Sequence, residues 1–491
     1  MNSLRAIFFA AVFFCAGVAR AEPLVSSWMT IDGAKYARIY KTQADALAGS
    51  SVSNWIPSGR MTGGGQTNPA YAGVQSVRES TNFVYVQSSA LANHVMGPWY
   101  FDATKTNIFV NYPSKQDMLA RFPRTPTSTV TKTKTALGAI ALWVDGTIIH
   151  NQLDAFYWNG TNDANSASVF TRSWQRNARY AEGLTFDPDG AHQPYTGEHH
   201  HHLNPYGLRY DLGDHMDYNP TNHIYTENAA SSNHSPIVGW SFDGYPIYGP
   251  YGFSDPTNMS SAVTRMRSGY VFRDGSFGTT NLNVTGRTSY PAWANAIGNP
   301  TTSNGPPVST NFPIGWYVQD FDHIGDHGYV QGVDFDLDRY NGRNCKTPEF
   351  PTGTYAYFIA IDSNAAPAFP YIIGLQYYGV KNGGDLGNPA SVGFTNVETN
   401  VVVYLGGPNA DAIFKAPTNA SATTLTLTWS SIEGGHYKIE SSANFATWTN
   451  EIADVRANGT NSQGNANALA TQKIFRATRT SLETYDQVST P

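Results

Sequence analysis

The sequence has little charge. Only 14% of its 491 residues are Asp, Glu, Lys or Arg, and 8 methionines stand beside 29 tyrosines. Helical bundles and coiled coils are excluded, because such proteins are rich in Ala, Glu, Lys and Leu. Disorder is excluded as well, since 13% of the residues are aromatic and rings of that size bury enough apolar surface to offset the entropy lost on folding. We expect a folded chain of about two or three domains.

Cysteine is also scarce. The chain has 2 cysteines, and Cys15 lies in a segment with the features of a secretory signal: Arg5, an apolar run from Ala6 to Val18, and the small-residue site Ala19 to Ala21. We therefore expect residues 1–21 to be removed and the protein to be secreted or periplasmic. Only Cys345 would then remain, which excludes a disulfide within the mature chain.

An excess of basic residues and a second long apolar run are both missing. Loss of Arg5 and Arg20 with the signal leaves 29 basic against 37 acidic residues, a net charge of −8. This balance gives no basic surface for nucleic acid. Downstream of the signal no apolar run is long enough to span a membrane.

Short β-strands are the main pattern. Residues 22–75 read as an N-terminal extension with one short helix near 42–47, and from residue 76 short apolar runs alternate with Gly, Pro and Asn. The pairs Asp145-Gly146 and Asp243-Gly244 each separate two apolar runs, and Asp-Gly is typical of type I′ hairpins. We predict a mainly β fold, with a large sandwich or distorted barrel over residues 76–408.

Residues 409–491 are predicted to form a separate small β-sandwich module. From Thr424 to Trp429 polar and apolar residues alternate, which puts Leu425, Leu427 and Trp429 on one face of a strand. The segment resembles fibronectin-III-like modules. Such modules serve as spacers or attachment units, so we expect no catalysis there and consider a cell surface or a polysaccharide as its partner.

Four consecutive histidines, His199 to His202, lie between a Gly and an Asn-Pro pair. On a strand, alternate side chains share a face, so His200 and His202 can reach one metal ion while His199 and His201 point away. Imidazole suits Zn, Cu, Fe or Ni. The remaining ligands must come from elsewhere, and the candidates are His94, His192, His215, His223 and His234 with the oxygen donors Asp214, Asp217 and Asp243.

Two alternatives to a metal site stay open. The four histidines could form a solvated polar tract without a role. Each isolated histidine could be an ordinary hydrogen-bonded structural residue.

The chain resembles the YHYH family of exported proteins, whose naming segment is Gly-x-Tyr-His-Tyr-His. Residues Gly197 to His202 match this segment, with His200 and His202 on the two family histidines and His199 and His201 in place of the tyrosines. The resemblance covers roughly residues 76–379. Its further motifs are Asn93 to Gly97, Gly138 to Asn151, Ala191 to Pro194, His234 to Pro250, and Asp336 to Arg343 followed by Thr347 to Tyr355.

Some positions depart from the family pattern. Asp189 stands where members often have Cys, and Arg339-Tyr340 replaces Glu-Cys. The loss of thiols leaves a nitrogen and oxygen donor set. We predict a site for copper or zinc, and the family resemblance implies no particular reaction. The predicted ligands are His94, His192, His200, His202, His234 and Asp243.

An acidic segment from Asp320 to Asp338 is dense in oxygen donors. It is not an EF-hand, because Arg339 and Cys345 stand where that loop requires Gly and Glu. It remains a candidate calcium or second metal site, with a solvated acidic loop as the alternative. The sequence contains no H-E-x-x-H, G-x-S-x-G or Walker motif, which argues against zincin proteases, α/β-hydrolases and P-loop enzymes.

Two functions are consistent with these sequence features. The first is an exported transition-metal-binding protein, either storing the metal or using it catalytically on a bound water or on oxygen. The second is a non-catalytic surface or carbohydrate-binding protein, in which aromatic side chains form a binding platform. The candidate platform residues are Trp240, Tyr245, Tyr248 and Tyr251.

Overall fold

The structure is a computed structural model. It describes residues 23–30, 35–56, 63–165, 174–230, 232–294, 304–388, 397–406, 412–415, 418–421, 423–432, 434–459, 461–467 and 474–482. The predicted signal, residues 1–21, lies outside the described residues. No helix in the described ranges is long and apolar enough to cross a membrane.

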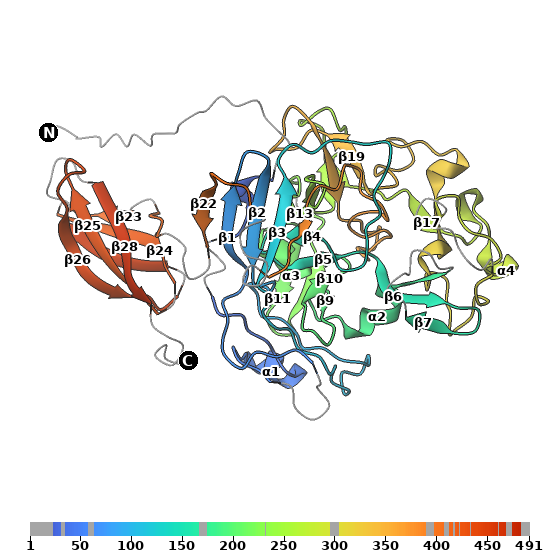
Figure 1. The fold of residues 1–491 in the computed structure, drawn as a ribbon, viewed down its shortest axis with the longest axis horizontal. Coiled ribbons are helices and arrows are strands. Elements are labelled where there is room, and N and C mark those ends of the chain that lie inside the picture. The colour runs from blue at the N-terminus through green and yellow to red at the C-terminus, as the bar shows by residue number, and fades with distance from the viewer. Residues whose placement is uncertain are drawn as a thin grey trace.

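Two β-sheets form the body of the protein (Figure 1). The larger sheet has the strand order β19 (Gly342–Cys345), β20 (Thr354–Phe358), β14 (Pro246–Tyr248), β13 (Ile237–Ser241), β4 (Ala139–Trp143), β5 (Ile148–His150), β10 (His200–His201) and β9 (Ala191–His192). The second has the order β21 (Gly384–Asp385), β3 (Met118–Pro123), β2 (Phe83–Ser88), β1 (Val74–Glu79) and β22 (Val402–Leu405).

Apolar side chains from both sheets meet in one core, which makes this body a β-sandwich. Val77 and Phe122 of the smaller sheet belong to the same buried cluster as Leu142 and Phe242 on the larger sheet's side. The rings of Phe122 and Phe242 lie 5.5 Å apart between their centroids. The prediction of a mainly β fold is confirmed, and of its two forms the sandwich is the one found: none of the described sheets closes into a barrel.

The two Asp-Gly hairpins form, although with a different turn from the one predicted. β4 pairs antiparallel with β5, and β13 with β14. Gly146 and Gly244 have φ angles of 89° and 90°, whereas Asp145 and Asp243 are not among the residues with positive φ. A type I′ turn needs two positive φ angles, so that prediction is wrong. The N–H of Trp143 bonds to the carbonyl of Thr147, and that of Ser241 to the carbonyl of Tyr245, so each pair closes a loop of three residues whose last is a left-handed glycine.

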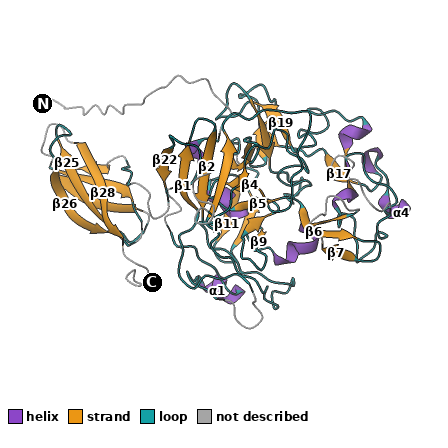
Figure 2. Cartoon of the chain, in the orientation of Figure 1, coloured by secondary structure: helices purple, strands orange, loops and turns teal. Residues whose placement is uncertain are grey.

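Smaller elements surround the sandwich (Figure 2). The short helices are α1 (Gln43–Ala48), α2 (Ala178–Glu182), α3 (Tyr206–Asp211) and α4 (Leu282–Thr285), with 3-10 turns at Val25–Ser27, Gly183–Thr185, Ser276–Gly278, Val318–Asp320 and Ile324–His327. The small sheets are β7 (Asp163–Asn165), β6 (Leu153–Trp158) and β8 (Gln175–Asn177); β11 (Met216–Asn219) and β12 (Ile224–Glu227); β15 (Tyr251–Phe253) and β16 (Val263–Arg265); and β17 (Tyr270–Phe272) and β18 (Phe321–His323).

The segment predicted as an N-terminal extension packs against later residues. The side chain of Thr42 accepts a hydrogen bond from the backbone N–H of Asp45 and caps α1, close to the predicted helix. Ile39 and Trp55 share a buried cluster with Met96 and Trp99. This part of the chain therefore lies against the loops that follow β2.

The C-terminal residues form two three-stranded sheets. Their orders are β23 (Thr418–Ala420), β24 (Thr424–Ser430), β27 (Asn461–Asn467), and β26 (Thr449–Arg456), β25 (Gly435–Ser442), β28 (Ile474–Leu482). Leu427 and Trp429 are buried together with Tyr437 and Ile439 from the other sheet, and Leu425 packs against them. The alternation in β24 thus sets which side of the strand faces the core of this module.

Candidate metal centre

Strand pairing at one edge of the larger sheet brings distant histidines together. β10 pairs antiparallel with β9, which places His200 opposite His192. On its other side β10 pairs in parallel with β5, which places His200 opposite Ile148. Because His150 ends β5, its ring also reaches this edge and stacks on His200 with 3.8 Å between the ring centroids.

We call His150, His192, His200, His202 and Glu182 the histidine cluster. Among the described residues, sets of three potential ligand atoms within 4.8 Å of one another occur twice: one in His150, His200 and His202, the other in Glu182, His192 and His202. His202 belongs to both sets. The side chains of His192 and His202 are only 6% and 3% exposed, so water has little access to their nitrogens.

Hydrogen bonds assign the proton of three of these imidazoles to Nδ1. His200 Nδ1 lies 2.8 Å from the carbonyl oxygen of Glu198, and His202 Nδ1 lies 2.5 Å from that of Asn151. A carbonyl can only accept, so both Nδ1 atoms donate. His192 Nδ1 lies 2.7 Å from Thr185 Oγ1, whose own proton goes to the carbonyl of Glu182. His192 therefore donates from Nδ1 as well.

The Nε2 atoms that remain are bare lone pairs directed at one another. His200 Nε2 and His202 Nε2 lie 3.0 Å apart. Glu182 Oε2 lies 3.7 Å from His192 Nε2 and 3.5 Å from His202 Nε2. Two lone pairs at 3.0 Å repel each other unless a cation lies between them. Two nitrogens bound to one ion at about 2.1 Å in tetrahedral geometry would lie about 3.4 Å apart, within a few tenths of the distance found here.

Protonation does not supply that cation at neutral pH. Burial, together with the neighbouring imidazoles, holds the pKa of His192 and of His200 well below the ordinary value and lowers the pKa of His202 to about 3. Burial and the nearby carboxylate of Asp154 raise the pKa of Glu182 to about 8. In the metal-free protein His192, His200 and His202 are therefore neutral imidazoles beside the protonated carboxyl of Glu182.

The other two histidines of the consecutive run lie on the opposite side of β10. His201 Nδ1 accepts a hydrogen bond from Trp143 Nε1 at 3.1 Å, and His201 Nε2 lies 2.6 Å from Asp189 Oδ2. His199 Nδ1 lies 3.3 Å from Gln193 Oε1. All four histidines are buried, with at most 4% exposure, so the alternative of a solvated tract is wrong.

Two predicted ligands, His94 and Asp243, lie apart from the histidine cluster. His94 Nε2 forms an ion pair with Asp189 Oδ2 at 3.1 Å, on the His201 side of the strand. Asp243 accepts hydrogen bonds from the Tyr357 hydroxyl at 2.7 Å and the Gly379 N–H at 2.8 Å. Neither joins a set of three ligand atoms among the described residues. The prediction that these side chains converge on His200 and His202 is therefore corrected.

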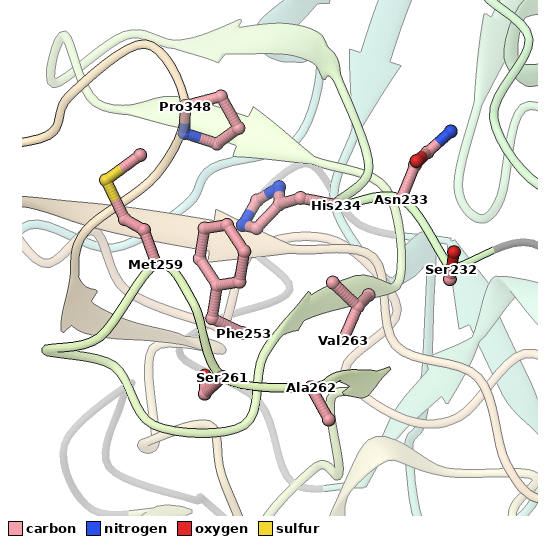
Figure 3. A pocket seen from close by; sticks show the side chains of 9 residues that line it. All are labelled: Ser232, Asn233, His234, Phe253, Met259, Ser261, Ala262, Val263 and Pro348. Carbon is pink, nitrogen blue, oxygen red and sulfur yellow. The ribbon is translucent and has the colours of Figure 1, made fainter.

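His234 lies at a different pocket, of about 590 Å³ (Figure 3). Its ring stands between Phe253 and Pro348, with Met259 on the far wall. His234 Nδ1 donates to the carbonyl of Ser235 at 2.7 Å. The described part of the chain places no second histidine or carboxylate in the lining of this pocket, so His234 does not complete the metal site that the sequence suggested.

The remaining histidine and aspartate candidates have structural partners. His215 Nε2 contacts the carbonyl of Asn233 at 2.7 Å, and His223 Nδ1 forms a hydrogen bond with the Tyr218 hydroxyl. Asp214 accepts from Arg209 at 2.6 Å, and Asp217 from Asn228 at 3.0 Å. These contacts leave them outside the cluster.

The proposed aromatic platform does not exist as a surface. Trp240 and Tyr248 are fully buried, and Tyr245 and Tyr251 are 7% and 8% exposed. All four belong to the buried hydrophobic cluster of the sandwich. That part of the second hypothesis is wrong.

The acidic segment is mostly neutralised by arginine. Asp320 accepts from Arg287 at 2.7 Å, and Asp336 accepts from Arg267 at 2.9 Å. Residues 320–338 are all described, and they contain no set of three ligand atoms close enough to hold one ion.

Sequence reasoning missed two members of the histidine cluster. His150 follows the apolar pair of β5, and only the parallel pairing of β5 with β10 brings it to His200. Glu182 ends α2, ten residues before His192 in the chain. The only sequence feature that could have identified His150 is its position directly after a predicted hairpin strand.

Comparison with known proteins agrees with this region of the chain. A family model described as "YHYH protein" matches residues 119–370, about half of the chain. The whole histidine cluster lies inside the matched range, and His94 lies outside it. Searches of curated proteins and of solved structures found no match.

Proposed function

The chain belongs to the YHYH family, and we propose that it is an exported transition-metal-binding protein whose ion is held by the histidine cluster. The observation that carries this proposal is the pair of unprotonated nitrogens, His200 Nε2 and His202 Nε2, 3.0 Å apart in a buried site. A divalent ion between them would turn a repulsive contact into two bonds.

The surroundings of the imidazoles support the same conclusion. Metal-binding histidines characteristically donate their other ring N–H to a carbonyl, a carboxylate or water, which fixes the tautomer and the orientation of the ring. The carbonyls of Glu198 and Asn151 have this role for His200 and His202, and Thr185 has it for His192. His150 Nε2 contacts Glu198 Oε1 at 2.6 Å, which leaves its Nδ1 as the ligand atom.

The chemistry of the ligand atoms indicates which metals the cluster can bind. The cluster offers imidazole nitrogens and one carboxylate, and the one mature cysteine, Cys345, is buried in the core of the sandwich. Such sites suit zinc and copper rather than calcium. The four imidazoles and Glu182 fall into two overlapping sets of three ligand atoms, one fewer than the four ligands of a structural zinc site. We propose binding of the ion, and this donor set is compatible with storage and with catalysis alike.

The rest of the chain fits this role. An N-terminal signal would deliver the protein to the periplasm or beyond, where it meets external metal. The C-terminal module, which we propose to be fibronectin-III-like, would attach it to a cell surface or a polysaccharide.

Competition titration against a chromogenic chelator tests the proposal with Zn²⁺ and Cu²⁺. His200→Ala should weaken the binding of at least one of these ions by about tenfold or more, because removal of an outer partner of a ligand alone can cost that much. The matched control is His436→Ala in the C-terminal module, whose histidine pairs with Asp454; it should leave affinity unchanged. Equal affinity in both variants and the unaltered protein would refute the assignment.

A further inference from the structure

A second cavity lies on the His201 side of β10, beyond the histidine cluster. Its volume is about 210 Å³. The wall is built by α3, by β11 and β12, and by the loops that carry Tyr40, His94 and Asp189. This volume is below the roughly 300–1,000 Å³ of sites for drug-sized ligands, so the cavity suits a compact molecule.

One end of the cavity is polar and incompletely hydrogen-bonded. The side chain of His94 is only 8% exposed, and its Nε2 pairs with Asp189. Among the described residues His94 Nδ1 has no hydrogen-bond partner, and Asp211 Oδ2 lies 3.9 Å from it. A buried nitrogen in this condition costs free energy unless a ligand or water satisfies it.

The charge state of His94 makes Nδ1 a donor. Burial lowers the pKa of His94, but the carboxylates of Asp189, Asp211 and Asp145 outweigh burial and raise it to about 10. Asp189 is itself fixed by His201 Nε2 at 2.6 Å and by the Gly207 N–H. An imidazolium N–H and a carboxylate oxygen thus stand side by side at the cavity, each able to bond the same hydroxyl group.

The other side of the cavity is aromatic. The ring of Tyr218 lies 4.8 Å from that of Tyr225 and 5.5 Å from that of Tyr210, and Tyr40 lies 5.3 Å from His223. His223 has a φ of 56°, a backbone conformation that favours glycine or asparagine, and its ring is held by a hydrogen bond with the Tyr218 hydroxyl. Strained backbone of this kind concentrates at functional positions.

We propose that this cavity binds one neutral sugar ring. A sugar hydroxyl can accept from His94 Nδ1 and donate to Asp211, while the apolar face of the ring packs on the tyrosines. An ammonium has no lone pair to accept from His94 Nδ1, and the carboxylates of Asp189 and Asp211 disfavour an anionic ligand. The proposal is independent of the metal site, because the histidine cluster uses the opposite side of β10.

Saturation-transfer NMR and calorimetry with the full mature protein test this idea. The probes are the methyl glycosides of glucose, galactose, mannose and N-acetylglucosamine, with tetramethylammonium as the cationic probe. We expect saturable binding of at least one glycoside that is insensitive to salt and persists in His200→Ala.

Two variants locate the bound sugar. Tyr210→Ala removes a ring that is 42% exposed, and Asp211→Asn removes the acceptor charge at a partly exposed site. Each should weaken binding about three- to tenfold, the range expected for one aromatic contact or one hydrogen bond. Tyr195→Ala, which removes an exposed tyrosine outside the cavity lining, is the control. Absence of binding by every glycoside, binding of tetramethylammonium alone, or binding unaffected by both variants would overturn the proposal.

Discussion

Replacement of His202 by alanine tests the geometry of the histidine cluster most sharply, because both sets of ligand atoms share this residue. At a free metal concentration one hundred times the dissociation constant, an ion bound only by the folded state stabilises it by about 2.7 kcal/mol. If His202→Ala weakens binding tenfold, the same metal concentration contributes only about 1.4 kcal/mol. The metal-induced increase in unfolding free energy should therefore fall by about half.

The assay is denaturant unfolding at fixed free metal, repeated with chelator. His199→Ala is the matched control, since it removes a buried imidazole three residues away on the other side of β10. Both variants lose stability without metal, because each leaves a cavity. Only His202→Ala should lose part of the increment due to metal. An equal loss in both variants, or an unchanged increment in His202→Ala, would refute the proposed ligand set.

Further predictions concern the residues around this site. His234→Ala should leave metal affinity unchanged in a chelator titration, because His234 lies at a separate pocket; a tenfold loss would return it to the ligand set. The pKa of Glu182 is raised to about 8 in the metal-free protein, so metal uptake at pH 7 should release about one proton and metal affinity should fall as the pH drops below 8. Calorimetry in buffers of different ionisation enthalpy measures this proton release. Glu182→Gln should abolish the release. A protein ending at Pro408 should remain folded and bind metal, because the C-terminal strands have a core of their own; unfolding or metal loss in gel filtration and metal analysis would contradict this independence.

Local patterns predicted local features well. Alternation placed His200 and His202 on one side of β10 and His201 on the other, because side chains alternate along any strand. The glycines of the two hairpins also lie at turns, as the Asp-Gly pairs predict. Even here the detail differed: only the glycine has positive φ, since the loop has three residues and not two.

Contacts between distant segments could not be predicted in this way. His150 reaches His200 through parallel pairing of β5 and β10, whose register depends on the packing of the whole sheet. His94 and His234 are also histidines in segments that match the family motifs, yet the fold places both outside the histidine cluster. Trp240 and Tyr248 were candidates for a surface platform because the sequence does not show that β13 and β14 lie inside the sheet.

An anomalous difference map from a crystal of the metal-soaked mature protein tests the central claim most directly. We expect one strong peak within about 2.0 to 2.2 Å of His200 Nε2 and His202 Nε2, with His192, His150 or Glu182 completing the shell. A map with no peak at these nitrogens, or with ions only at surface histidines, would contradict it.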